Sequence, residues 1–254
     1  MTLTDRLLAE GYEVESATDA PTGLETASAG GDAIGRYLLR HCNAMTFGFF
    51  AARPNPEGEF HKQLGIHDLY FGAPAGTAPA GKLGCIQQVM PPPIGSIQKR
   101  LGRRLTSMLA PATHHMTGLL SIAEDQPRAE NRLTIDRARH DRYGLPRVRI
   151  EHAYTDRDRA ARDTLVAWSK RILRGAGARF FYTHRIETFS HAVGTVRAGI
   201  DPATSALDAG CRVRGMENLY VVDGSFMPTS AAVNPSLTIA ANALRTATLA
   251  LGDR

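Results

Sequence analysis

Near its C-terminal end the chain reads Asn218-Leu-Tyr-Val-Val-Asp223-Gly224-Ser225. The four apolar residues at 219–222 form a short continuous run, which is typical of a strand buried on both faces. The run ends in an Asp-Gly pair, and in open α/β sheets ligands lie beyond the carboxyl ends of strands. Asp-Gly is also a common turn pair, so a plain exit from strand to turn is the alternative interpretation.

A helix is predicted shortly after this strand, over residues 234–251. Asn234 is a favourable N-cap, and Pro235 suits the first helical position. Small and apolar residues follow at helical spacing, namely Leu237, Ala241, Leu244, Thr248 and Leu251. Such a helix can pack closely against a sheet. Its N-terminus carries a positive charge of about half a unit, which suits an anion. An amphipathic helix that binds no ligand is the alternative.

His191 opens a third distinctive stretch, His191-Ala-Val-Gly-Thr-Val-Arg-Ala-Gly-Ile-Asp-Pro202. Imidazole titrates near neutral pH and can take the proton of a hydroxyl group. A single histidine is more often structural or exposed. Combined with the apolar strand and the Asn-Pro-Ser-Leu-Thr sequence at 234–238, however, His191 becomes a candidate general base. Asn234 is then a neutral group that can orient a substrate oxygen.

These stretches, in this order and at this spacing, resemble the signature of the glucose–methanol–choline (GMC) flavin oxidoreductases. The resemblance extends back to Glu130-Asn-Arg-Leu-Thr-Ile-Asp136, to Tyr143-Gly-Leu-Pro146, and to Gly35-Arg-Tyr-Leu38 with the following His41. It implies FAD-dependent oxidation of an alcohol, a CH–OH donor, in which a hydride passes to the flavin. The implied substrate is a small-molecule alcohol.

The resemblance also assigns the site residues. The catalytic positions of the family are matched by His191 as base and by Asn234 as its partner. The FAD-contacting positions are matched by Asp223, Gly224, Asn234, Pro235 and Ser236. It implies no metal ligand, and the other histidines of the chain show no metal-site spacing.

The dinucleotide fingerprint of the family, G-x-G-x-x-G after a first strand, does not occur in this sequence. Gly175-Ala-Gly177 has Phe180 in place of the third glycine and follows a predicted helix, so it indicates a helix end. We therefore expect an N-terminal FAD-binding half, or an oligomer partner, to complete the enzyme, and we expect this chain alone to be inactive. The alternative is a non-catalytic truncated or split-gene module that binds a partner or substrate without flavin.

The chain is predicted to have an α+β fold. Residues 33–184 are expected to form a substrate-binding domain with a mainly antiparallel sheet and flanking helices, after a poorly defined lead-in at 1–32. Residues 185–254 are expected to form the catalytic segment, whose strand and helix complete a Rossmann-like FAD-binding domain.

Within the substrate-binding domain, alternating residues predict half-buried strands at 133–135 and 148–150, and an aromatic run predicts a strand at 180–182. A capping box at Thr155 and Asp158 predicts a helix that ends at Gly175. Its buried stripe is expected to contain Leu165, Trp168 and Ile172.

Composition narrows the functional class. The formal net charge is only +5 and the basic cluster at 99–104 lacks interleaved aromatic residues, so we predict a solvated helix face there and no nucleic-acid binding. No apolar run approaches the ~20 residues that span a bilayer. Three cysteines without paired or metal spacing suggest reduced thiols and a cytoplasmic protein.

Overall fold

The computed structural model describes residues 31–58, 62–74, 79–91, 94–187 and 191–252. Its strands are β1 (Ala44–Phe49), β2 (Gly65–Ile66), β3 (Gly84–Val89), β4 (Met116–Ala123), β5 (Arg132–His140), β6 (Pro146–Glu151) and β7 (Phe180–Arg185). Its helices are α3 (Ile94–Leu101), α4 (Arg103–Thr113), α5 (Asp156–Gly175) and α6 (Ser236–Gly252), with 3-10 helices η1 (Gly31–Ala33) and η2 (Gly224–Phe226).

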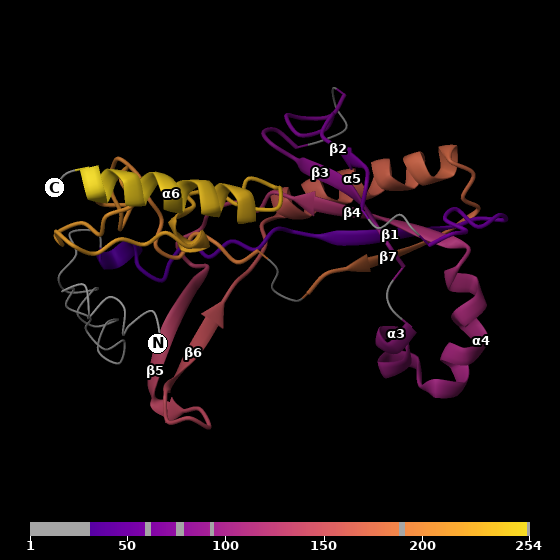
Figure 1. The fold of residues 1–254 in the computed structure, drawn as a ribbon, viewed down its shortest axis with the longest axis horizontal. Helices are drawn as coiled ribbons and strands as arrows, with labels where there is room; N and C mark the ends of the chain where they lie inside the picture. The colour runs from indigo at the N-terminus through magenta and orange to yellow at the C-terminus, as the bar shows by residue number, and fades with distance from the viewer. Residues whose placement is uncertain (1–30, 59–61, 75–78, 92–93, 188–190, 253–254) are drawn as a thin grey trace.

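An antiparallel sheet of five strands forms the centre of the fold, in the order β2-β3-β4-β1-β7. A separate hairpin of β5 and β6 projects from it, and α6 lies with long loops at the opposite end from the α3–α4 pair (Figure 1). The predicted combination of helices with antiparallel sheets is confirmed, as is the predicted strand at 180–182.

Helix α5 covers one face of the five-stranded sheet. The Thr155 hydroxyl accepts a hydrogen bond from the Asp158 backbone N–H, and the Asp158 carboxylate accepts one from the Thr155 N–H, so the predicted capping box is confirmed. Leu165 is fully buried against the sheet, which contributes about 1.5–3 kcal/mol. The hydroxyls of Ser169 and Ser121 meet at 3.1 Å and link α5 to β4.

The opposite face of the sheet is turned away from α5. Ile86 on β3 and Leu119 on β4 belong to the core beneath α5. Because side chains alternate along a strand, Gln87 and its cross-strand neighbour Leu120 lie on the opposite face. We call this surface of the sheet its open face.

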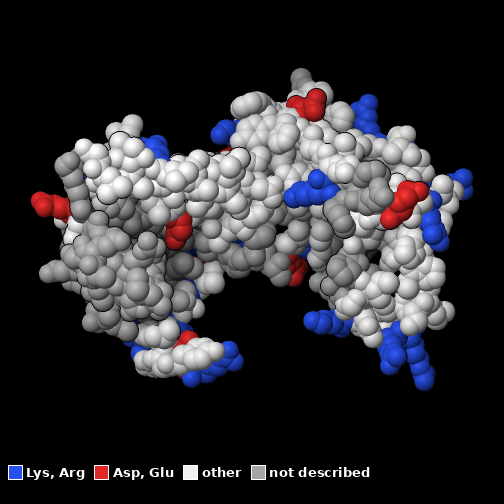
Figure 2. Space-filling view, in the orientation of Figure 1, with Lys and Arg blue, Asp and Glu red and all other residues white. Residues whose placement is uncertain are grey.

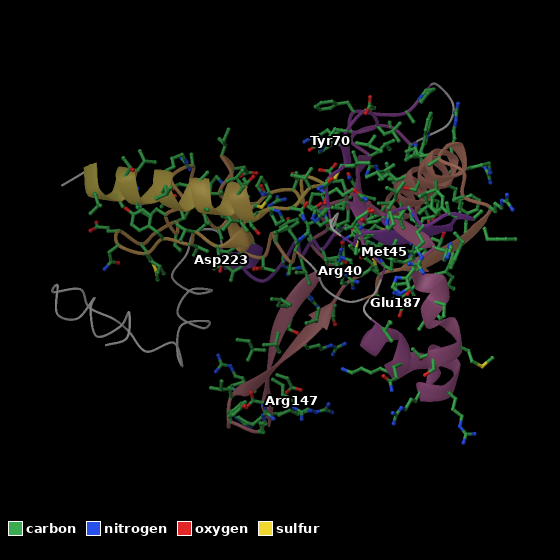
Figure 3. The ribbon with its side chains drawn as sticks, turned by 45° about the vertical axis from the view of Figure 1, so that its right-hand side comes forward. Arg40, Met45, Tyr70, Arg147, Glu187 and Asp223 are labelled. Atoms are coloured by element: carbon green, nitrogen blue, oxygen red, sulfur yellow. The ribbon has the colours of Figure 1, made fainter. Side chains whose placement is uncertain are left out.

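The β5–β6 hairpin has the predicted strands but not the predicted half-burial. Leu133 pairs with Ile150, and Ile135 with Val148, so these four apolar side chains share one face. Val148 is 58% exposed and Ile150 51% exposed, because no layer of described residues covers that face. Arg147 lies near the far end of the hairpin, well away from the sheet (Figure 3).

The predicted buried strand at 219–222 is wrong for the described residues. Only Tyr220 forms a bridge, with Arg212, and the side chains at 219–222 are half-buried. A strand buried on both faces needs neighbours on either side, and the described residues supply a single bridging residue. Instead, Leu219 and Val221 pack with Val213 in a small apolar cluster around Leu207.

Helix α6 is confirmed, but the apolar stripe that was expected to pack against a sheet is exposed. Leu237, Leu244 and Leu251, from the predicted stripe, are 83%, 73% and 62% exposed. Ile239 and Thr246, on the other side of the helix, face the loops beneath. The stripe therefore exists, and no described residue covers it.

Charged residues mark the outer parts of the molecule. Lys99, Arg103 and Arg104 are exposed, which confirms the predicted solvated face. Figure 2 shows basic side chains at the ends of the hairpin and of the α3–α4 pair, on either side of a hollow. No helix in the described ranges is long and apolar enough to cross a membrane. Residues 1–30 of the predicted lead-in at 1–32 lie outside the described residues.

Candidate functional site

The segment that contains His191 is held against the chain that leads into β1. Leu39 and Val193 exchange two backbone hydrogen bonds, at 2.9 and 3.0 Å. Gly194, at φ +96°, leaves no room for a side chain, because a Cβ there would lie 2.4 Å from the Tyr37 carbonyl oxygen. This close pairing brings the two distant segments together and determines where His191 lies.

The pairing places His191 beside a second histidine, His41. The two imidazole rings meet edge to face, with centroids 5.2 Å apart and planes at 83°. His41 is 1% exposed, and neither of its ring nitrogens has a hydrogen-bond partner within the described residues. Nδ1 of His191 is also buried and unpaired there. Three buried polar atoms are thus available to a ligand or to each other.

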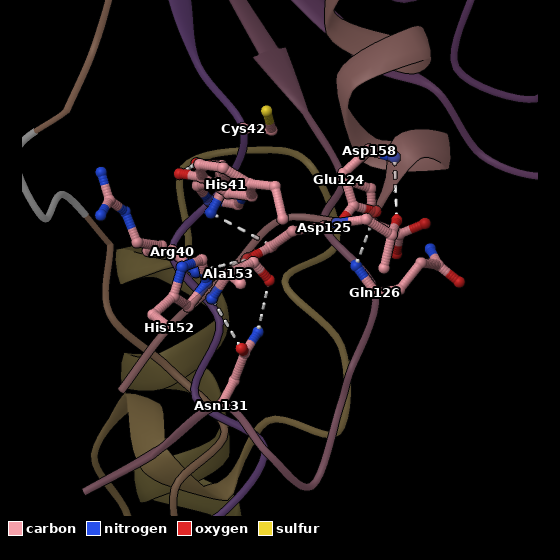
Figure 4. Close-up of polar contacts among 12 residues, drawn as sticks. Arg40, His41, Cys42, Glu124, Asp125, Gln126, Asn131, His152, Ala153 and Asp158 are labelled. Carbon is pink, nitrogen blue, oxygen red and sulfur yellow. Dashed lines mark hydrogen bonds and ion pairs between the residues drawn. The ribbon is translucent and has the colours of Figure 1, made fainter. Parts of the chain in front are cut away.

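Asp125 fixes the backbone that carries His41. Its carboxylate accepts hydrogen bonds from the backbone N–H groups of Arg40, at 2.8 Å, and of His41, at 3.1 Å (Figure 4). His152 Nε2 lies 3.6 Å from the same carboxylate. Burial alone would raise the pKa of Asp125, but hydrogen bonds from His152 and from Arg40 outweigh it and hold the pKa below its usual value. Asp125 therefore remains an anion.

Both site histidines are held in the neutral form. Burial, with a smaller contribution from His191, lowers the pKa of His41 to about 4 against the opposing pull of Asp125. Burial also lowers the pKa of His191, and the positive charge of Lys62 adds to the effect. A histidine with a lowered pKa is unprotonated at neutral pH, which is the state a proton acceptor requires.

Asn234 is joined to the open face of the sheet. Gln87 Nε2 donates a hydrogen bond to Asn234 Oδ1 at 2.6 Å, and Tyr70 Oη donates one to the Ala231 carbonyl at 2.8 Å. Asn234 is therefore not observed to cap α6, which begins at Ser236, because its side-chain oxygen is engaged by Gln87.

Several residues of the site have an uncommon backbone conformation. His41 and His191 have φ angles of +59° and +57°, and Ala231 and Ala232 have φ angles of +57° and +50°. Left-handed φ is uncommon outside glycine, and such residues cluster at functional sites. Both histidines and the loop before Asn234 share this feature.

Of the predicted cofactor-binding residues, Gly224 lies next to the His191 segment, because its carbonyl accepts a hydrogen bond from the Gly194 N–H. Asp223 Oδ1 accepts a hydrogen bond from the Ser225 N–H at 2.8 Å and caps η2. A Cβ on Gly224 would lie 3.1 Å from Val193 and 3.2 Å from Ile239, so protein packing leaves little room for a side chain there. Pro235 is buried, and Ser236 is exposed in the first turn of α6.

Two residues of the site were not predicted from the sequence. The resemblance included His41 after Gly35-Arg-Tyr-Leu38 but gave it no role, and Gln87 carried no signal, because a glutamine on a strand is common. Conversely, the cavity of about 760 Å³ between α5 and β7 contains none of the predicted site residues. No group of His, Cys, Asp and Glu among the described residues could hold a metal ion, and Cys42, Cys85 and Cys211 are buried free thiols.

The sequence is similar to proteins of known families. Residues 127–243 match the sequence profile of the family described as GMC oxidoreductase. The chain is 41% identical over 129 residues to 6'''-hydroxyparomomycin C oxidase of Streptomyces lividus, a match that covers 50% of this chain and 23% of that protein. It is 40% identical over 137 residues to paromamine 6'-oxidase of Streptomyces fradiae, covering 52% and 25%. Choline oxidase of Arthrobacter globiformis is 32% identical over 123 residues, covering 45% and 22%.

Solved structures share the fold. Pyridoxine 4-oxidase from Mesorbium loti superposes with a TM-score of 0.51 at 22% identity, over 85% of this chain and 42% of that one. Formate oxidase of Aspergillus oryzae RIB40 superposes with a TM-score of 0.58 at 13% identity, over 87% and 48%. The chain thus spans about a quarter of the length of the curated relatives above and less than half of these two structures.

Proposed function

We propose that this chain, whose residues 127–243 match the GMC oxidoreductase family, supplies the catalytic histidine and the substrate-binding surface of an enzyme that oxidises a CH–OH group with FAD. The observation that carries the proposal is the pairing of His191 with His41. It gives a partly buried imidazole with a lowered pKa and an unpaired Nδ1, in the sequence context that the resemblance predicts.

His191 is proposed as the base. Its neutral imidazole takes the proton of the substrate hydroxyl as the C–H bond breaks. Asn234, held from the sheet by Gln87, is proposed to orient the substrate oxygen. Bound FAD would supply the hydride acceptor. Proton removal and substrate orientation are then the tasks of this chain.

The described residues are compatible with FAD. Buried, unpaired nitrogens on His41 and His191 show that the site is polar and incompletely satisfied. The residues proposed to hold the cofactor are Asp223, Gly224, Asn234, Pro235 and Ser236. The first turn of α6, which contains Ser236, exposes backbone N–H groups that favour an anionic group.

A second polypeptide half is proposed to complete the site. The apolar stripe of α6 and the apolar face of the hairpin are exposed, and the molecule is hollowed between the hairpin and the α3–α4 pair (Figure 2). Exposed apolar patches of this kind favour association. The partner would carry the G-x-G-x-x-G fingerprint, and residues 185–254 would complete its Rossmann-like domain. Buried free thiols fit the proposed cytoplasmic location.

The proposed substrate is a small alcohol. Two relatives at 40–41% identity are named as oxidases of paromamine and 6'''-hydroxyparomomycin C, which makes an amino-sugar alcohol the first class to test. The relatives are named as oxidases and dehydrogenases, so the alternative of a non-catalytic module is not favoured.

Co-expression tests the proposal. This chain is produced with a polypeptide that carries the fingerprint half, and the purified complex is examined for flavin absorbance and for bleaching by a panel of alcohols. We expect a yellow complex, bleaching by at least one alcohol, and no retained FAD in the chain alone. A flavin-loaded complex that no alcohol bleaches would contradict the oxidation, and stoichiometric FAD on the lone chain would contradict the need for a partner.

A further inference from the structure

Gln87 connects the open face of the sheet to the segment that precedes α6. It lies on β3 opposite Leu120, on the face turned away from α5. Its Nε2 donates to Asn234 Oδ1 at 2.6 Å, across 147 positions of sequence. This is a direct side-chain contact from the sheet to a predicted catalytic residue.

The contact determines which end of the Asn234 amide is available. A carboxamide has an oxygen that accepts and an NH2 group that donates, on opposite branches of one plane. Because Oδ1 is turned to Gln87, Nδ2 is left on the other branch, and it has no partner within the described residues. Asn234 therefore presents a donor, as the orientation of an alcohol oxygen requires.

The orientation of Gln87 is itself constrained. Its Nε2 lies 3.6 Å from Cys85 Sγ as well as 2.6 Å from Asn234 Oδ1, so one NH2 group contacts both acceptors at once. Gln87 Oε1 is buried without a hydrogen-bond partner in the described part of the chain. A buried, unpaired acceptor is unfavourable, so this oxygen is suited to a donor on a ligand.

We infer that Gln87 is a positioning residue of this site: it holds Asn234 with its NH2 group free for the reacting oxygen, and it presents Oε1 to a second donor on the substrate. The inference rests on the proposed function and gives a structural reason for its substrate class. The class is an alcohol that carries another hydroxyl or amino group near the carbon that is oxidised.

The test begins with nuclear magnetic resonance of the full chain, with no cofactor, in a Leu244→Glu background that limits self-association through the exposed stripe of α6. The Asn234 side-chain NH2 signals are followed in wild type, in Gln87→Leu, and in the matched control Gln88→Leu. Gln88 is next on the same strand but on the other face, where its Oε1 accepts from the Gln63 N–H. We expect Gln87→Leu to shift the Asn234 signals and lower their order parameter, and Gln88→Leu to leave both unchanged.

Gln87→Glu provides a second variant of nearly the same shape. A carboxylate cannot donate to Asn234 Oδ1, so the Asn234 amide should turn and donate Nδ2–H to it. We expect a downfield shift of those protons. Unchanged Asn234 signals in both Gln87 variants, with a native backbone spectrum, would overturn the inference.

A kinetic arm follows in the flavin-loaded complex with the partner half. Gln87→Leu should reduce kcat/KM for a diol or amino alcohol at least about tenfold more than for the matching mono-alcohol, because a site built to accept a hydrogen bond discriminates on it. Equal losses for both substrates would overturn the substrate class. A wild-type complex that reduces no flavin would instead refute the proposed function, while the resonance result on Asn234 would still decide the role of Gln87.

Discussion

The ring of His191 lies edge-on against the ring of His41, 5.2 Å away, and both residues have left-handed backbone angles. Each ring is kept neutral by burial, and a proton on one raises the cost of a proton on the other. The pair can thus take up one proton far more readily than two. The proposed alcohol oxidation requires a base that is neutral at the start and accepts a single proton.

Replacing the proposed base gives the first prediction. In the flavin-loaded complex, His191→Ala should slow flavin reduction by roughly 10²–10⁴-fold, the usual range for loss of a general base. Stopped-flow absorbance with the same alcohol measures the rate. His67→Ala serves as control, because His67 is an exposed histidine outside the site. A His191→Ala complex that reduces flavin at the wild-type rate would show that the proposed role of His191 is wrong.

The second prediction concerns acid stability and His41. Its pKa is 6.5 in the unfolded chain and about 4 in the folded one, so the unfolded state binds more protons between these values. The contribution to stability is complete above pH 6.5 and is lost as the pH falls towards 4. It amounts to about 3 kcal/mol. Urea unfolding from pH 7 to pH 4.5 measures it.

The variant His41→Phe distinguishes the contribution of this histidine to the pH dependence of stability from that of other titrating groups. Phenylalanine fills a similar space without a charge, so the variant should show a flatter pH dependence between 6.5 and 4. Asp125, whose pKa is also lowered, acts in the same direction, but only at lower pH, below the ordinary carboxyl pKa of 3.8 and outside this range. An identical pH profile in wild type and variant would mean that His41 is not the buried neutral group described above.

Asn234 gives the third prediction. Asn234→Ala should raise the barrier to flavin reduction by about 1–3 kcal/mol, since it removes a positioning hydrogen bond and not the proton acceptor. Its effect on unfolding should be small, because the side chain is exposed and bonds Gln87 rather than the first turn of α6. Asn218→Ala, also exposed, is the control. A loss as large as that of His191→Ala would reassign the base.

The exposed stripe of α6 gives the fourth prediction. Leu244 is 73% exposed between Leu237 and Leu251, so the lone chain should self-associate or bind its partner half through this stripe. Leu244→Glu should reduce association, measured by sedimentation velocity. Ala247→Glu places the same charge on the exposed flank of the helix and should change association less. A monodisperse wild-type monomer in dilute buffer would count against the second-half proposal.

Local rules in the sequence were sufficient for several elements. The capping box at Thr155 and Asp158 predicted α5, and the aromatic run at 180–182 predicted β7, because caps and strand runs act between residues close in the chain. Asn234 and Pro235 predicted the start of α6 to within two residues. The family signature also pointed to His191 and Asn234, whose roles remain predictions.

Tertiary structure decided which faces are covered and which distant residues meet. Periodicity identified the stripe of Leu237 and Leu244 correctly, but not that it would be exposed, since burial depends on a second surface elsewhere. The contact of His41 with His191, and that of Gln87 with Asn234, join residues far apart in the chain. Sequence determined the local elements and the candidate chemistry of this protein. The pairing of Leu39 with Val193, a non-local hydrogen-bonding event that no local pattern encodes, decided where that chemistry is assembled.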